Sequence, residues 1–170
     1  KRRMMTRNPK NHSEPVKFIT DHNLGKLAKW LRLLGYDTIC HGGKADRSFW
    51  RRARGDRRVL LTRRKNLQYY PGEVETVVLE EETLDGQLSE LLDKFPVGPE
   101  REHFFRYCSV CNVRLRRIVK NDVLDRVPPY VLETQDHFYL CPSCSRIYWP
   151  GSHVDRIKEN LRKHNLMDLP

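Results

Sequence analysis

The stretch VKFITDHNLGKLAKWLRLLGYDTIC, residues 16–40, decides the fold because it predicts a strand, a helix and a second strand in direct succession. Residues 16–20 form an apolar run that is typical of a short buried strand. Residues 23–34 repeat apolar side chains at helical spacing, and Gly35 follows as a helix end. Residues 36–40 predict the second strand. Such a unit is typical of a parallel sheet with right-handed crossovers.

The alternation of strand and helix continues along the chain. A helix at about 45–54, ended by Gly55, precedes a strand at 59–62. A strand at 74–79 and a helix at 83–95 complete the series. The predicted fold class is therefore α/β, with a parallel sheet over residues 16–95 that carries helices on both faces.

The character of the sequence changes at PVGPERE, residues 96–102, which we interpret as a linker. Beyond it come short strands, paired cysteines, a loop at Pro128 and Pro129, and an amphipathic helix at about 152–164. Residues 103–170 therefore predict a second, smaller domain, and the basic residues 1–15 a further linker. Because the chain begins with Lys, we expect it to be part of a longer polypeptide.

The chain carries 32 Lys and Arg against 22 Asp and Glu, a net charge of +10. This excess indicates a polyanionic partner, and nucleic acid is favoured over an anionic membrane because no basic amphipathic helix dominates. A solvated surface that only confers solubility is the alternative. The sequence has neither an 18-residue apolar run nor a signal peptide. We therefore expect no membrane partner and an intracellular protein, in the cytoplasm rather than the nucleus.

Two identical Cys-x-x-Cys pairs are separated by 29 residues. Four thiolates in this pattern are typical of a tetrahedral zinc site, and they leave no open position for a catalytic water. Disulfides and a redox-active pair are the alternatives, and the lack of a secretory segment disfavours disulfides. The predicted cofactor is structural Zn²⁺, and its ligands are Cys108, Cys111, Cys141 and Cys144. Cys40 has no partner in the pattern, so we expect it to be a buried core residue.

Two aspartates approach the carboxyl edge of the predicted sheet. Asp21 ends the first strand, and Asp46 begins the second helix. Two convergent carboxylates are enough to hold a hydrated Mg²⁺ or Mn²⁺ together with a substrate phosphate. Each aspartate has an alternative interpretation as the N-cap of the helix that follows it.

Cations gather near the same edge and on the two helices beside it. Three of them directly follow the buried strand at 59–62, where a phosphate is a suitable ligand. Simple solvation of these side chains is the alternative. The candidate RNA-binding residues are Lys26, Lys29 and Arg32 on the first helix, Arg47, Arg51 and Arg54 on the second, and Arg63, Arg64 and Lys65 after the strand.

Apolar side chains offer a different kind of surface. Trp30 and Leu33 lie toward the polar side of the first helix, where exposed apolar residues would mark a protein partner. Seven aromatic residues flank the cysteine pairs, and we expect most of them to pack in the small domain and one or two at most to be exposed. These seven are Phe104, Phe105, Tyr107, Phe138, Tyr139, Tyr148 and Trp149.

Several pieces of the sequence together resemble the Mut-seven C-terminal domain family: FITDHNLGKLAKWLRLLGYDT, Asp46 with Ala53, RVLLTR, the two cysteine pairs and RIYWPGSH. The resemblance covers nearly everything from residue 16 to about residue 163. It implies a PIN-like ribonuclease fold joined to a zinc ribbon, a unit that also forms the tail of Mut-seven-type 3′–5′ exoribonucleases. His153 matches the family too, and we expect it to be structural.

The resemblance makes Asp21 and Asp46 members of an acidic Mg²⁺ or Mn²⁺ site, and the four cysteines zinc ligands. The third acidic position of the family follows LLTR, and here it is Arg64. A cation beside a divalent ion disfavours metal-assisted cleavage, whereas arginine suits a phosphate. We therefore expect the two aspartates to be remnants that are hydrogen-bonded to Arg63 or Arg64.

Three functions follow as hypotheses. The first is a non-catalytic RNA-binding domain at the end of a 3′–5′ exoribonuclease, which also docks a protein partner. The second is an active endoribonuclease that uses Asp21, Asp46 and Mg²⁺ or Mn²⁺. The third is a protein-interaction module without RNA binding.

Overall fold

A computed structural model describes residues 16–43, 46–65, 74–95 and 104–151, together with Asp155, Glu159, Arg162 and Lys163. The predicted linkers at 1–15 and 96–102 and the predicted role of His153 lie outside the described residues. Most of the predicted last helix, 152–164, also lies outside them. Its four described residues are helical and exposed.

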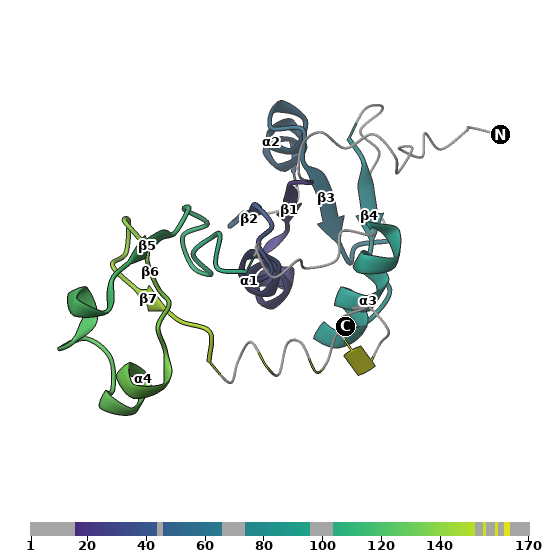
Figure 1. Cartoon of the computed structure of the whole chain (residues 1–170). Helices are drawn as coiled ribbons and strands as arrows, with labels where there is room; N and C mark the ends of the chain where they lie inside the picture. The colour runs from purple at the N-terminus through teal and green to yellow at the C-terminus, as the bar shows by residue number, and fades with distance from the viewer. Residues whose placement is uncertain are drawn as a thin grey trace.

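The first part of the chain forms the predicted α/β fold (Figure 1). Its four strands are all parallel and lie in the order β2-β1-β3-β4. The sheet consists of β1 (Phe18–Thr20), β2 (Thr38–Cys40), β3 (Val59–Thr62) and β4 (Thr76–Val78). The helices are η1 (His22–Leu24), α1 (Gly25–Leu33), α2 (Arg47–Gly55) and α3 (Leu84–Lys94).

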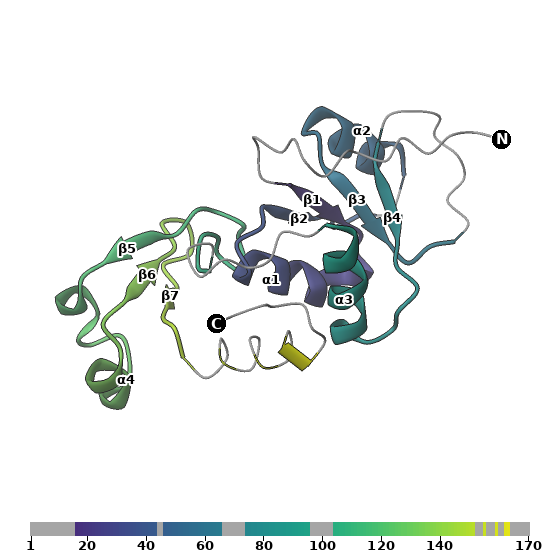
Figure 2. The same cartoon turned by 45° about the vertical axis from the view of Figure 1, so that its right-hand side comes forward.

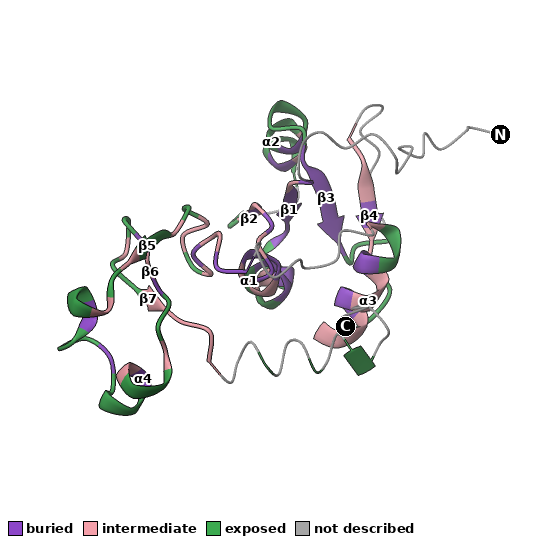
Figure 3. Ribbon diagram, in the orientation of Figure 1, coloured by how far each residue is buried: buried purple, intermediate pink, exposed green. Residues whose placement is uncertain are grey.

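Side chains of β1 and β3 alternate between the two faces of the sheet, so each face has its own core. Phe18 packs with α1 and α3 in one apolar cluster. Ile19 and Leu60 pack on the opposite face against Phe49 and Ala53 of α2. The helices therefore cover both faces, as predicted (Figure 2). Figure 3 shows the result as buried central strands and an exposed outer face of α2.

The helix boundaries differ from the prediction at two places. The first helical segment begins as the 3₁₀ turn η1, and α1 ends before Gly35, whose φ of 92° suits only glycine at low cost. The second difference is at Gly55, which we expected to stop α2. Gly55 remains helical, and the chain instead turns at Arg57, which adopts a φ of 51°.

The second part of the chain forms a three-stranded antiparallel sheet in the order β5-β6-β7. Its strands are β5 (Arg116–Ile118), β6 (Phe138–Leu140) and β7 (Ile147–Tyr148). Between β5 and β6 lie η3 (Lys120–Val123) and α4 (Pro129–Thr134). The predicted loop is therefore confirmed at Pro128, which precedes the helix as its N-cap, and wrong at Pro129, where α4 begins. Proline is favoured at the first position of a helix because its missing N–H has no helical partner there, and α4 begins in this way.

The two parts share one apolar cluster. Phe104 and Phe105 are 8% and 7% exposed and pack with α1, and the Phe105 N–H donates to the Leu33 carbonyl over 3.4 Å. Trp30 and Leu33 are half-buried against this cluster. The prediction that these two residues form an exposed partner surface is therefore wrong, because the chain's own aromatic residues cover that side of α1.

Candidate metal centre and nucleic-acid interface

The first cysteine pair sits in a tight turn whose backbone groups point at sulfur. The Cys111 N–H donates to Cys108 Sγ over 3.3 Å. The Cys108 carbonyl accepts from the Asn112 N–H at 3.0 Å, and the Cys108 N–H donates to the Val113 carbonyl at 2.8 Å. Asn112 closes the turn with a φ of 59°, a left-handed conformation that asparagine tolerates better than most residues.

The second pair repeats this turn. The Cys144 N–H donates to Cys141 Sγ over 3.4 Å. The Cys141 carbonyl accepts from Ser145, and its N–H donates to Arg146, both at 2.9 Å. Ser145 has a φ of 57°. Two equivalent turns therefore present two thiols each, in the geometry that a Cys-x-x-Cys spacing favours.

The four ligand atoms lie within 4.8 Å of one another, and all five cysteines of the chain are free thiols. The cluster can therefore hold a metal ion, and the alternative of two disulfides is wrong for this structure. Burial opposes the charge on Cys108, but hydrogen bonds from Tyr148 and the turn lower the pKa of this thiol to about 6. The Tyr148 hydroxyl lies 3.0 Å from Cys108 Sγ. Such donors stabilise the thiolate that a metal requires.

Cys40 lies outside this cluster. It is half-buried at the end of the edge strand β2, and its thiol donates to the Asp21 carbonyl over 3.7 Å. The prediction of a buried core cysteine is therefore wrong, because β2 is an edge strand among the strands that the structure describes.

Asp21 is completely buried at the end of β1. Its Oδ1 accepts from the Asn23 N–H at 3.0 Å, which caps η1, and its Oδ2 accepts from the Thr62 hydroxyl at 2.8 Å. The capping alternative is confirmed for Asp21. The expected hydrogen bond from Arg63 or Arg64 to Asp21 is wrong: among the described residues the donors to this carboxylate are the Asn23 N–H and the Thr62 hydroxyl, and the Arg63 guanidinium pairs with Glu82.

Asp46 is exposed and caps α2. Its Oδ1 accepts from the Ser48 hydroxyl at 2.6 Å, the Ser48 N–H at 2.8 Å and the Phe49 N–H at 3.4 Å. The Ser48 hydrogen bonds lower the pKa of Asp46. Among the described residues, the four cysteines form the one cluster of three or more potential ligands, so the two aspartates do not gather a third one.

The cations after β3 differ in their partners. Arg63 forms an ion pair with Glu82, at 3.1 Å, beyond the end of β4. Arg64 and Lys65 are exposed, and the Arg64 N–H donates to the Thr62 hydroxyl at 3.2 Å. The same hydroxyl therefore connects Arg64 to the buried Asp21. The acidic run at 80–82, which was not among the predicted site residues, partly offsets the positive charge at this edge.

Residues 16–161 match the family model described as the Mut7-C RNAse domain. The chain belongs to this family. No curated protein and no solved structure matches the chain. In the described part of this Mut7-C RNAse domain, no helix has the length and apolar character needed to cross a membrane.

The basic helix faces of this Mut7-C RNAse domain are exposed at five of the six predicted positions. These are Lys26 and Lys29 on α1, and Arg47, Arg51 and Arg54 on α2. Both helices follow strands of a parallel sheet, so each begins at the carboxyl edge and runs away from it. Lys26 and Arg47 therefore lie nearest to that edge, and Arg54 about one helix length away.

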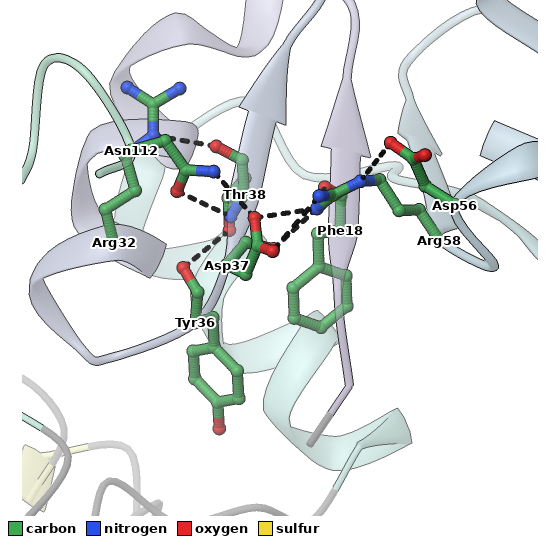
Figure 4. Close-up of polar contacts among 8 residues, drawn as sticks. All are labelled: Phe18, Arg32, Tyr36, Asp37, Thr38, Asp56, Arg58 and Asn112. Atoms are coloured by element: carbon green, nitrogen blue, oxygen red, sulfur yellow. Dashed lines mark hydrogen bonds and ion pairs between the residues drawn. The ribbon is translucent and has the colours of Figure 1, made fainter. Parts of the chain in front are cut away.

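Arg32 is the exception, and its predicted place on the solvent face is wrong. It is 7% exposed, and its guanidinium donates to three carbonyls, of which Figure 4 shows the one of Thr38. Nε bonds to Thr38 over 2.7 Å, and Nη1 bonds to Ser109 and Val110 over 2.9 Å each. Ser109 and Val110 are the two residues between Cys108 and Cys111. Arg32 therefore joins α1 and β2 to the first cysteine turn.

A second connection runs through side chains that the sequence analysis did not single out. Asn112 Nδ2 donates to Asp37 Oδ1 over 2.6 Å, and Asn112 Oδ1 accepts from the Thr38 N–H at 3.0 Å. Asp37 also binds Arg58 through two hydrogen bonds of 2.8 and 3.0 Å (Figure 4). The contact joins Asp37 and Thr38 of the segment GYDT to Asn112, the residue after the first cysteine pair, and these two places in the sequence are where it could have been looked for.

This network fixes the charge of Asp37. Burial opposes its ionisation, but the hydrogen bonds from Arg58 and Asn112 hold the pKa of this carboxyl below its usual value. A bidentate arginine–carboxylate pair is also geometrically specific. The candidate metal centre is therefore attached to the α/β sheet through a charged and directional contact.

Proposed function

We propose that this Mut7-C RNAse domain binds RNA without cleaving it, at the end of a 3′–5′ exoribonuclease, and that the cysteine cluster holds a structural Zn²⁺. Four thiolates without an open position suit zinc in a structural role. The observation that carries the proposal is the state of the carboxyl edge. Asp21 is buried with a donor on each carboxylate oxygen, and the exposed Arg64 lies two residues after Thr62, the donor to one of these oxygens.

Electrostatics favours a phosphate over a metal ion at this edge. A guanidinium about 5 Å from a divalent ion is repelled by several kcal/mol at an effective dielectric constant near 20. Solvent screening reduces this cost for an exposed side chain but does not change its sign. Arg64 and Lys65 can each contact a phosphate oxygen, and Arg64 can do so with two parallel hydrogen bonds.

The remaining exposed cations extend this surface along the two helices. Lys26 and Arg47 lie closest to the edge on opposite faces of the sheet, and Arg51 continues the path on α2. Contacts of this kind are made mainly to the phosphate backbone, so binding tolerates different sequences and weakens with salt. Arg63 contributes less in this proposal because Glu82 already pairs with it.

The test is RNA affinity of the 170-residue chain as a function of salt. The double variant Arg64→Glu with Lys65→Glu is expected to weaken binding to single-stranded RNA and to flatten the salt dependence. Arg116→Glu is the matched control, because Arg116 is an exposed cation on β5 of the other domain. Equal affinities and equal salt slopes for the double variant and the control would remove the edge from the proposal.

The second candidate is an endoribonuclease that uses Asp21 and Asp46 with Mg²⁺ or Mn²⁺. Its support is the family description and the place of both residues at helix starts beside the sheet edge. Incubation with single-stranded RNA and Mn²⁺ tests it. Asparagine caps a helix about as well as aspartate, so Asp46→Asn keeps the fold. Cleavage that Asp46→Asn and Asp21→Asn both abolish would replace the non-catalytic proposal.

Docking of a protein partner is part of the same proposal, but it no longer rests on Trp30 and Leu33. Among the described residues after the linker, three apolar side chains are more than half exposed instead: Val119 at 64%, Leu124 at 53% and Tyr130 at 65%. Pull-down before and after ribonuclease treatment separates a direct protein contact from a bridge through RNA.

A further inference from the structure

An open groove of about 330 Å³ lies where the second domain meets the aromatic residues that pack on α1. Three arginines line it, Arg106, Arg114 and Arg117, and Phe105 and Tyr139 contribute aromatic surface. Neither an aspartate nor a glutamate is among its lining residues. None of its residues belongs to the carboxyl edge of the parallel sheet.

Strand register explains why cations and an aromatic ring meet here. Arg117 of β5 lies directly opposite Tyr139 of β6, and directly opposite residues point to the same face of an antiparallel sheet. Tyr139 also stacks on Phe105, with ring centroids 5.4 Å apart and planes inclined by 15°. Tyr139 is half-buried, so the stack fixes the ring while part of it stays accessible.

The arginines of the groove are available for a ligand of opposite charge. Arg114 and Arg117 are exposed. Arg117 Nη2 lies 2.8 Å from His137 Nδ1. Because a guanidinium only donates, His137 Nδ1 accepts this hydrogen bond. Histidine is not a carboxylate, so it does not neutralise the positive charge of Arg117, and no carboxylate lines the groove. This arrangement favours an anion with several acceptor oxygens.

We propose that this groove is a second RNA site, which binds single-stranded RNA through phosphates at Arg114 and Arg117 and through a base placed against Tyr139. The proposal rests on the proposed RNA-binding function and adds a site remote from Arg64. Cations beside a fixed aromatic ring are the features that bind single-stranded nucleic acid without sequence preference. Bases inside a duplex are already stacked on one another, so the groove selects single strands.

The first experiment compares two neighbouring residues of one strand. Arg117 lines the groove, whereas the adjacent Arg116 does not, and the side chains of successive residues in a strand point to opposite faces. Fluorescence anisotropy with a labelled oligouridine measures Kd and its salt dependence. Arg114→Glu with Arg117→Glu is expected to weaken binding and to reduce the salt slope by about 1.4, because each lost contact to a single strand contributes about 0.7. Arg116→Glu is expected to bind like the native chain.

The second experiment tests the base contact without changing the fold. An oligonucleotide that carries 5-iodouridine is expected to cross-link to Tyr139 on irradiation. Tyr130 is the internal control, because it is 65% exposed and lies on α4 outside the groove. Cross-linking to Tyr130 and not to Tyr139, or equal affinity for an abasic oligonucleotide, would overturn the stacking contact.

The outcomes separate this proposal from the one on which it rests. Weaker binding in the Arg64 and Lys65 variant, together with native binding in the Arg114 and Arg117 variant, overturns the groove site alone. An absence of RNA binding by the native chain overturns both proposals. If a glutamate-rich peptide binds the groove and RNA does not compete with it, the partner of the groove is an acidic protein. That result also overturns the second RNA site.

Discussion

Asn112 and Asp37 form a 2.6 Å hydrogen bond that connects the first cysteine turn to the start of β2. The same asparagine accepts the Thr38 N–H, so one side chain serves both a carboxylate and a backbone group. Its φ of 59° comes from its place at the end of the cysteine turn. The backbone of Asn112 therefore closes the first cysteine turn, and its side chain binds the parallel sheet.

Substitution of Asn112 should separate these two tasks. Asn112→Gly keeps the left-handed backbone and removes the side-chain bonds, which should cost about 1–3 kcal/mol of unfolding free energy because Asp37 and Thr38 lose partners. Asn112→Ala should cost about 1 kcal/mol more, since alanine is strained at positive φ. Urea unfolding monitored by circular dichroism measures both. Ser145→Gly, at the equivalent place of the second turn, is the control and should cost much less.

The pH dependence of stability should report the Asp37 contact. Its pKa is lowered in the folded state, so the folded state binds fewer protons than the unfolded state as acid is added. This contribution to stability is present above the unfolded pKa of about 3.9 and is lost as pH falls through the folded value. Asp37→Asn should therefore be less stable than the native chain at pH 7, and the difference should shrink below about pH 4.

Acid also protonates thiolates and releases a bound metal, so the comparison needs a control for that effect. Asp56→Asn removes the weaker and more exposed partner of Arg58 and leaves the cysteine turns unchanged. A difference between the native chain and Asp37→Asn that stays constant from pH 7 to pH 3 would show that the carboxylate charge does not stabilise this contact.

Removal of the proposed metal ion should accelerate hydrogen exchange at the edge of the parallel sheet. Chelation of the proposed Zn²⁺ should loosen the first cysteine turn. The Ser109 and Val110 carbonyls of this turn accept from Arg32, and the Asn112 side chain accepts from the Thr38 N–H. Hydrogen exchange at the Thr38 amide should therefore accelerate. The Val59 amide donates to the Lys17 carbonyl at the other side of β1 and should remain protected. Equal exchange at Thr38 with and without chelator would show that the sheet keeps its edge independently of the metal.

The alternating strands and helices were predictable because the strands are short apolar runs and the helices repeat apolar side chains at helical spacing. Leu27, Leu31 and Leu34 are all buried, and β3 occupies the predicted residues 59–62. The cysteine cluster was also predictable, because two Cys-x-x-Cys pairs are typical of a site in which four thiols surround one metal ion. What the sequence left open was the choice between two roles for an aspartate, since a cap and a metal ligand have the same position at a strand end.

Contacts between the parallel sheet and the later part of the chain were not predictable for a different reason. Arg32 has the helical position of a solvent-facing residue, and only the docking of residues 109 and 110 against it makes that position buried. Trp30 and Leu33 are covered in the same way by the aromatic residues after the linker. Helical periodicity describes one helix and its own sheet, so it does not report a face that a later part of the chain covers.

Two basic residues of α1 should therefore respond differently to substitution. Arg32→Ala should lower the unfolding free energy by about 2–4 kcal/mol, because the buried Thr38 carbonyl and the partly buried carbonyls of the cysteine turn lose a charged donor. Lys29→Ala, three residues earlier on the same helix, should leave stability nearly unchanged and weaken RNA binding with a flatter salt slope. Urea unfolding and fluorescence anisotropy on both variants make the comparison. If the Arg32→Ala chain is as stable as the native chain but binds RNA more weakly, Arg32 contacts RNA. Its three hydrogen bonds then do not stabilise the contact between α1 and the cysteine turn.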